Sequence, residues 1–184
     1  SKALEEYLDD KDIVKLRTAV IHGTRNMYRS WLGETRRSAN DVTLWDHSYS
    51  VATLFKCAIV KNIIDCDKAS FDPLTFKWGI LSVNTDILSL LSKGIKLGDI
   101  RGYWDKMNEA FVEVKKFLEE EYPLGNEIYR DSSGIYFLIP EIESPIIGHL
   151  KKQLIEKINN IEPELMPKLL PTYLGIQESV QESI

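Results

Sequence analysis

Apolar residues in the first third of the chain follow the spacing of α-helices. Between residues 2 and 31 an apolar residue recurs about every 3.6 positions, and an acidic cluster at residues 9–12 predicts a break in that helix. A broad apolar stripe predicts a second helix over about residues 43–64, with Asn40 or Asp41 as its N-terminal cap. The N-terminal part of the chain is therefore predicted to be helical.

The pattern changes after a loop that contains Asp72 and Pro73. Short runs of apolar and β-branched residues, bounded by turn residues, then predict strands, and longer amphipathic stretches predict helices. The predicted elements are a strand at 78–83, a helical turn at 86–92, a loop at 94–102, a helix at 103–122, strands at 127–130 and 135–139 around a turn at 131–134, a helix at 145–160, and a proline-interrupted edge strand at 164–174.

The order strand, helix, two-strand hairpin, helix, strand is the βαββαβ unit of the ferredoxin-like fold. The predicted class is therefore α+β. We expect a helical segment at residues 1–72, followed by a ferredoxin-like domain at residues 73–184.

Composition narrows the class of protein. With 23 Lys and Arg against 28 Asp and Glu, the net charge of −5 gives no general reason to expect nucleic-acid binding. Two cysteines cannot form a disulfide framework, which favours a reducing compartment and predicts a cytoplasmic protein. No apolar run reaches the roughly 18 residues of a membrane-spanning helix, so no membrane association is expected.

Asp46 and His47 open the second predicted helix. In metal-dependent phosphohydrolases of the HD superfamily, an imidazole and a neighbouring carboxylate hold a divalent metal that activates water. Such a site also needs a His-Asp dipeptide from another helix, and this sequence contains none. The pair is therefore interpreted as an incomplete metal site, and the simpler alternative is helix capping and packing.

Polar residues at two places suggest a nucleotide site of the palm type. Asn84 and Asp86 follow the first predicted strand, and a hairpin turn follows the second strand. Two-metal phosphoryl transfer needs several carboxylates at these places, but the turn carries only one, so no catalytic residue is assigned. The turn residues proposed to lie near a nucleotide are Asp131, Ser132, Ser133 and Gly134.

The basic residues of the sequence are most concentrated near residue 30, with two aromatic residues among them. Guanidinium contacts combined with aromatic stacking suit RNA. A solvated helix face followed by a polar loop is the alternative. The candidate nucleic-acid contacts are Arg25, Arg29, Arg36 and Arg37.

Three stretches, residues 35–52 with Leu-Trp-Asp-His, 78–83 with Trp-Gly-Ile-Leu-Ser-Val, and 125–140, occur in this order. Together they resemble the N-terminal half of the CRISPR polymerase family, the large subunit of type III CRISPR complexes, and are most similar to its csx-type variant branch. In that family a circularly permuted HD domain precedes the first of two palm domains. The resemblance implies an HD-like remnant that ends in the Asp46 helix, followed by a first palm.

This resemblance implies a structural, nucleotide-pocket segment of an RNA-guided antiviral complex. The family is a metal-dependent nuclease and cyclic oligoadenylate synthase, using Mg or Mn with ATP. Because the catalytic Gly-Gly-Asp-Asp hairpin of its second palm is absent here, the chain is expected to be inactive alone. Implied partners are other type III subunits, guide RNA through the complex, and the remainder of its own large subunit.

Two other hypotheses stay open from the sequence. One is a free-standing nucleotidyl cyclase or HD-type phosphohydrolase, which predicts Mg-nucleotide binding that depends on Asp86. The other is an adaptor that has no nucleotide site and uses its exposed helices to bind a partner.

Overall fold

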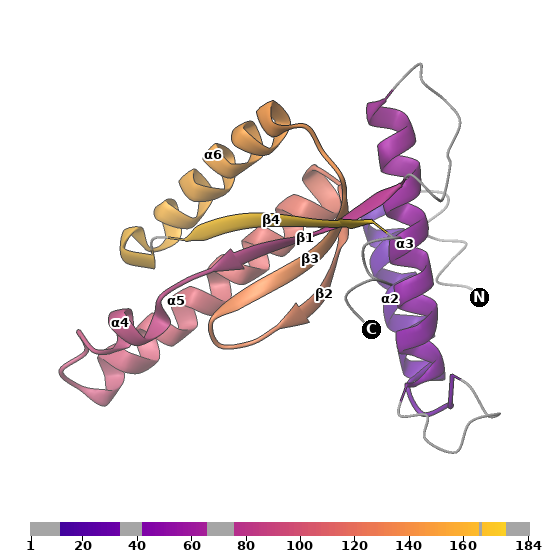
Figure 1. Cartoon of the computed structure of the whole chain (residues 1–184). Helices are drawn as coiled ribbons and strands as arrows, with labels where there is room; N and C mark the ends of the chain where they lie inside the picture. The colour runs from indigo at the N-terminus through magenta and orange to yellow at the C-terminus, as the bar shows by residue number, and fades with distance from the viewer. Residues whose placement is uncertain (1–11, 34–41, 66–75, 166, 176–184) are drawn as a thin grey trace, which may run out of the picture. The chain divides into compact units, whose positions relative to one another are not determined.

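The computed structural model describes residues 12–33, 42–65, 76–165 and 167–175. Its class is α+β, with helices first and a four-stranded sheet after them, as the sequence predicts (Figure 1). The chain divides into two compact units, Ser1–Ala52 and Thr53–Ile184. The domain boundary predicted at residues 72 and 73 lies outside the described residues and stays a prediction.

Helix α2 (Ile13–Tyr28) is the first described element. It begins directly after the acidic cluster, where Asp12 caps it by accepting a hydrogen bond from Lys15 N at 3.1 Å. None of its residues is buried. The sequence predicts a helix over residues 2–31, but α2 already ends at Tyr28. Residues 2–11 lie outside the described part of the chain.

Helix α3 (Leu44–Ile64) matches the second predicted helix. Thr43 supplies its cap, because Asp46 N donates to Thr43 Oγ1 at 3.1 Å and Thr43 Oγ1 donates to Asp46 Oδ2 at 2.7 Å. The predicted caps, Asn40 and Asp41, lie outside the described residues. Helix α3 begins in the first compact unit and continues into the second.

The four strands form one antiparallel sheet in the order β2-β3-β1-β4. The hairpin β2-β3 lies on one side of β1, and β4 lies on the other side. Because β4 is an edge strand, Pro171 can occupy it without losing a ladder hydrogen bond in the sheet interior, as predicted. The strands are β1 (Lys77–Asn84), β2 (Asn126–Arg130), β3 (Gly134–Pro140) and β4 (Lys168–Gly175).

Two predicted boundaries in this unit are wrong. Residues 97–102 belong to helix α5 (Leu97–Lys116) and not to a loop, because Lys96 N donates to Asp99 Oδ2 at 3.0 Å and starts the helix early. The segment after residue 162 first forms a 3₁₀ turn, η2 (Pro163–Leu165), so the last strand begins four residues later than Glu164. The remaining helical elements are α4 (Ile87–Leu91), the π-helical turn η1 (Phe117–Glu121) and α6 (Ser144–Ile161).

One face of the sheet forms the core. Side chains alternate along β3, so that Ile135, Phe137 and Ile139 are fully buried while Tyr136 and Leu138 between them stay partly exposed. Helices α5 and α6 pack on the buried face and on each other. Apolar burial on this face holds the helices and the sheet together. Within the described ranges, no helix has both the length and the apolar character that crossing a membrane requires.

Candidate functional site

The C-terminal end of β1 meets the hairpin turn. Asn84 is paired in register with Gly134, and Thr85 N donates to Ser133 O at 2.8 Å. Residues about 50 positions apart in the sequence are thus neighbours at one end of the two central strands. The structure brings together the two halves of the candidate nucleotide site.

The single carboxylate of the turn holds the turn itself. Asp131 Oδ1 accepts hydrogen bonds from Ser133 N at 2.8 Å, Ser133 Oγ at 2.7 Å and Gly134 N at 2.9 Å. The hydroxyl of Ser133, followed by the two backbone amides, lowers the pKa of Asp131 below its usual value. Ser132 is exposed at the tip. Asp131 is therefore a turn-stabilising residue in this geometry.

The other carboxylate is also used locally. Asp86 caps α4, because its Oδ1 accepts a hydrogen bond from Ser89 N at 3.0 Å. One of its carboxylate oxygens is therefore engaged in capping the short helix that follows β1.

The space beside Gly134 is already filled. A Cβ added at Gly134 would overlap Asn84 Oδ1 and would lie 3.0 Å from Val83 O. The Asn84 amide also donates to Ser82 Oγ at 3.3 Å. The Asn84 side chain therefore lies directly against Gly134, one of the residues that the sequence predicts to lie near a nucleotide.

A pocket lies on the other side of β1, between α4, η2 and the start of β4. Its volume is about 550 Å³. Lys93 and Glu164 form an ion pair across it, with Lys93 Nζ 2.6 Å from Glu164 Oε2. The hydrogen bond that Lys93 donates to Glu164 raises the pKa of Lys93 above its usual value. The lining residues are Asn84, Thr85, Asp86, Ser89, Leu90, Lys93, Glu164, Leu165 and Lys168.

The candidate metal ligands Asp46 and His47 lie in the first turn of α3. The Asp46 carboxylate accepts a hydrogen bond from the Thr43 hydroxyl, and His47 N donates one to Thr43 O at 3.0 Å. Both residues therefore take part in starting the helix. The described residues contain no group of three or more His, Cys, Asp or Glu that could hold a metal ion. Among the described residues, Asp46 and His47 therefore do not make up a complete Mg or Mn centre.

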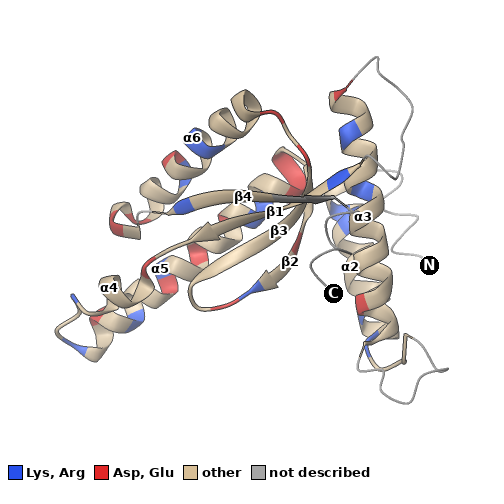
Figure 2. Cartoon of the chain, in the orientation of Figure 1, with Lys and Arg blue, Asp and Glu red and all other residues tan. Residues whose placement is uncertain are grey.

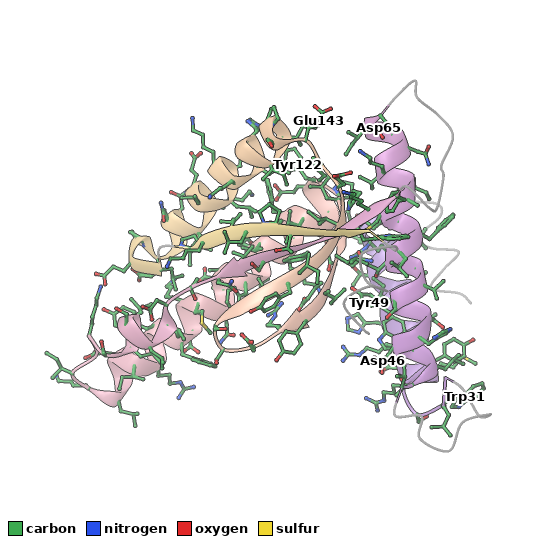
Figure 3. The ribbon with its side chains drawn as sticks, in the orientation of Figure 1. Trp31, Asp46, Tyr49, Asp65, Tyr122 and Glu143 are labelled. Atoms are coloured by element: carbon green, nitrogen blue, oxygen red, sulfur yellow. The ribbon has the colours of Figure 1, made fainter. Side chains whose placement is uncertain are left out.

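Arg25 and Arg29 are exposed at the C-terminal end of α2 and just beyond it. Tyr28 and Trp31 next to them form an edge-to-face pair with ring centroids 5.6 Å apart. Trp31 lies beside the start of α3, where Leu44 N donates to Trp31 O at 2.7 Å (Figure 3). The other two candidate arginines, Arg36 and Arg37, lie outside the described residues. On α5 and α6, basic and acidic residues are interspersed (Figure 2).

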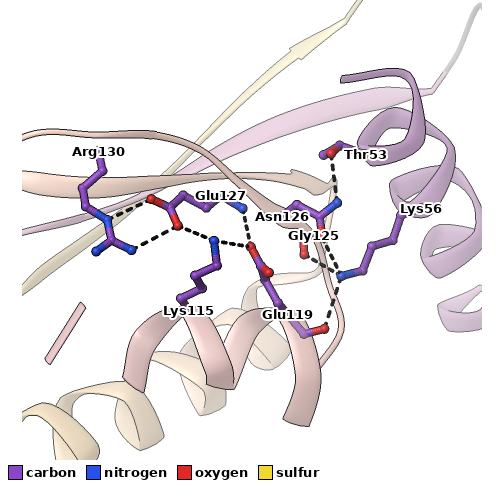
Figure 4. Close-up of polar contacts among 8 residues, drawn as sticks. All are labelled: Thr53, Lys56, Lys115, Glu119, Gly125, Asn126, Glu127 and Arg130. Carbon is purple, nitrogen blue, oxygen red and sulfur yellow. Dashed lines mark hydrogen bonds and ion pairs between the residues drawn. The ribbon is translucent and has the colours of Figure 1, made fainter. Parts of the chain in front are cut away.

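Sequence reasoning missed a polar cluster at the start of β2 (Figure 4). Lys56 Nζ donates to Gly125 O at 2.6 Å, to Asn126 Oδ1 at 3.0 Å and to Glu119 O at 3.4 Å. Asn126 Nδ2 in turn donates to Thr53 Oγ1 at 2.9 Å. These bonds fix the second half of α3 to the loop before β2.

The cluster continues through two acidic residues. Glu119, only 3% exposed in the π-helical turn, accepts a hydrogen bond from Glu127 N at 2.8 Å. Glu127 binds Arg130 through both of its oxygens, at 2.8 and 3.1 Å, and Lys115 Nζ at 2.7 Å. The buried carboxylates are therefore paired with cations and amides, which offsets the cost of removing them from water.

Cys57 lies next to this cluster and is fully buried. Burial raises the pKa of its thiol to about 12, and its Sγ lies 3.5 Å from Leu138 O. A thiol in this state is a poor nucleophile and a poor metal ligand. Cys57 is therefore a structural residue, and Cys66 lies outside the described part of the chain.

Replacing Lys56 by methionine is expected to lower the free energy of unfolding by about 1–3 kcal/mol, because buried acceptors on Gly125 and Asn126 lose their donor. Urea denaturation of the two proteins measures the difference. Lys61→Met on the same helix is the control, since among the described residues the ion pair of Lys61 is with the exposed Asp65, and its loss should cost less than about 0.5 kcal/mol. Equal losses in the two variants would contradict this role for Lys56.

Glu127 is expected to make stability depend on acid pH. Burial acts to raise the pKa of Glu127, but the hydrogen bonds from Arg130 and Lys115 outweigh it, so the pKa lies below the ordinary 4.5. The resulting stabilisation is complete above pH 4.5 and is lost as the pH falls through the lowered pKa. Denaturation of the parent and of Glu127→Gln between pH 3 and 7 should show a stability difference that shrinks only in acid. A difference that stays constant across this range would be inconsistent with the ion pairs.

No protein-family model matches this chain, and no match is found among the curated proteins.

Proposed function

We propose that the chain is a structural segment of the large subunit of a type III CRISPR complex, carrying a catalytically degenerate nucleotide pocket. In this proposal residues 73–184 form a ferredoxin-like, palm-type domain. The strand order β2-β3-β1-β4 in a fully antiparallel sheet supports that arrangement. The observation that carries the proposal is the meeting of the end of β1 with the hairpin turn at Asn84 and Gly134.

The hydrogen bonds of Asp86 and Asp131 support a pocket that is catalytically degenerate. Phosphoryl transfer with metal ions needs carboxylates that converge on the metals. Here Asp131 accepts hydrogen bonds within its own turn, and Asp86 accepts one from the start of α4. A domain of this kind would contribute binding and shape to the complex, while any catalysis would come from other segments.

The proposed partners are other type III subunits, guide RNA held by the complex, and the remainder of the same large subunit. The proposed ligand is ATP. Arg25 and Arg29 are proposed RNA contacts, supported by their exposure beside the Tyr28 and Trp31 rings. Asp46 and His47 are proposed as half of a metal site that other segments would complete.

Native affinity purification of the protein from its source cells tests the proposal. Mass spectrometry and extraction of bound nucleic acid should recover repeat-associated subunits and a short guide RNA. Recovery of the protein alone and free of RNA would contradict the proposal. A free-standing cyclase or phosphohydrolase would instead predict metal-dependent turnover by the purified chain, abolished in Asp86→Ala or His47→Ala.

A further inference from the structure

We propose that the pocket between α4, η2 and β4 binds the phosphate groups of a nucleotide through Lys93 and Lys168 without a divalent cation, and that Glu164 competes with the phosphate for Lys93. This inference rests on the proposed nucleotide role of the chain. It assigns the ligand to the side of β1 that faces β4, and not to the hairpin.

The space at the end of β1 favours the side that faces β4. At the hairpin turn the Asn84 side chain lies directly against Gly134, where an added Cβ would overlap its Oδ1. The pocket across β1, in contrast, is open and measures about 550 Å³. Sites for small ligands typically enclose about 300–1,000 Å³, so a nucleotide fits this volume.

The charges of the pocket favour an anion. Lys168 stands at the first position of β4, opposite Asn84 in register, and lines the pocket. In the described ranges Lys168 takes part in no ion pair, whereas Lys93 on the opposite wall is paired with Glu164. Two lysines from segments 75 residues apart therefore line one pocket, and their positive charges favour a group with several negative charges.

The ion pair can open at little cost. The side chains of Lys93 and Glu164 are 52% and 48% exposed, and exposed pairs contribute only about 0–1 kcal/mol. A phosphate carries more negative charge than the single carboxylate that it would displace. Glu164 is thus a competitor whose removal leaves Lys93 free for the ligand.

A divalent cation has no place in this arrangement. The described residues that line the pocket include two carboxylates: Asp86 Oδ1 accepts a hydrogen bond from the Ser89 amide, and Glu164 pairs with Lys93. A cation would also be repelled by both lysines. The lysines supply the positive charge that a metal ion supplies in active palm domains.

The test is an NMR titration of the full chain with ATP in the presence of EDTA, following the backbone amides of Ser89, Lys93 and Lys168. We expect Glu164→Gln to tighten ATP binding about two- to fivefold and Lys168→Ala to weaken it by a similar factor. Glu109→Gln is the matched control, since Glu109 forms the same kind of exposed pair with Lys106 on α5, outside the pocket. It should leave the affinity unchanged.

Two further ligands identify the group that is bound. Inorganic phosphate should shift the same amides as ATP, and adenosine should not. Adenosine binding as tight as that of ATP, an unchanged or weaker affinity in Glu164→Gln, or no shifts with ATP would each overturn the inference. Co-purification with guide RNA and partner subunits is a separate readout, so the pocket can fail this test while the proposed function still holds.

Discussion

Replacing Gly125 by alanine is expected to destabilise the protein by about 3 kcal/mol or more. A Cβ at this position would overlap the carbonyl oxygen of Leu138 and lie 2.8 Å from its carbonyl carbon, and both atoms belong to the backbone of β3. No side-chain rotation can relieve that overlap, so the loop or the strand must move. The movement would also pull Gly125 O away from Lys56 Nζ, 2.6 Å away in the parent protein.

Urea denaturation of Gly125→Ala measures this loss. Gly148→Ala is the control, because Gly148 lies inside α6 and an added Cβ there meets nothing within 4 Å. Alanine in an open helical position should raise the free energy of unfolding by about 0.5–1 kcal/mol. Opposite signs at the two glycines are therefore expected, and a neutral Gly125→Ala would refute the close approach of this loop to β3.

Much of the fold could be predicted from the chain because the core elements carry simple periodic patterns. The run of apolar, strand-forming residues at 135–139 is visible in the sequence, and the sheet buries every second one of them, Ile135, Phe137 and Ile139. The start of α5 was not predictable in this way. Its first residues include two glycines, Gly98 and Gly102, which are typical of a loop, and Leu97 is 82% exposed, whereas the hydrogen bond from Lys96 N to Asp99 that starts the helix has no apolar signal.

The candidate site was predictable only in part. Turn chemistry around Asp131 and the strand before Asn84 are local signals, and strand pairing then brings the two together. The pocket wall at Lys168 has no local signal, because it depends on which edge of the sheet β4 occupies. The bond between Lys56 and Gly125 joins residues 69 positions apart, and in sequence Lys56 looks like any polar residue of an amphipathic helix.

The expected cost of a substitution in the sheet depends on which face carries the side chain. A side chain on the helix-covered face of the sheet has its whole surface in contact with α5, α6 or neighbouring strands, whereas one on the other face retains water on one side. Two aromatic neighbours in β3 allow the comparison at almost constant size. Phe137 is fully buried, and Tyr136 is half-buried, with its ring 5.5 Å from that of Tyr129.

Phe137→Ala is expected to cost about 3–5 kcal/mol, since it removes the transfer free energy of a buried ring and leaves a cavity between the sheet and its helices. Tyr136→Ala should cost about 1–2 kcal/mol, because no closed cavity forms and only the pairing with Tyr129 is lost. Thermal and urea unfolding of both variants measure these differences. An equal loss of unfolding free energy in Tyr136→Ala and Phe137→Ala would mean that a second layer covers the other face of the sheet. It would contradict the open surface that the described residues present on that face.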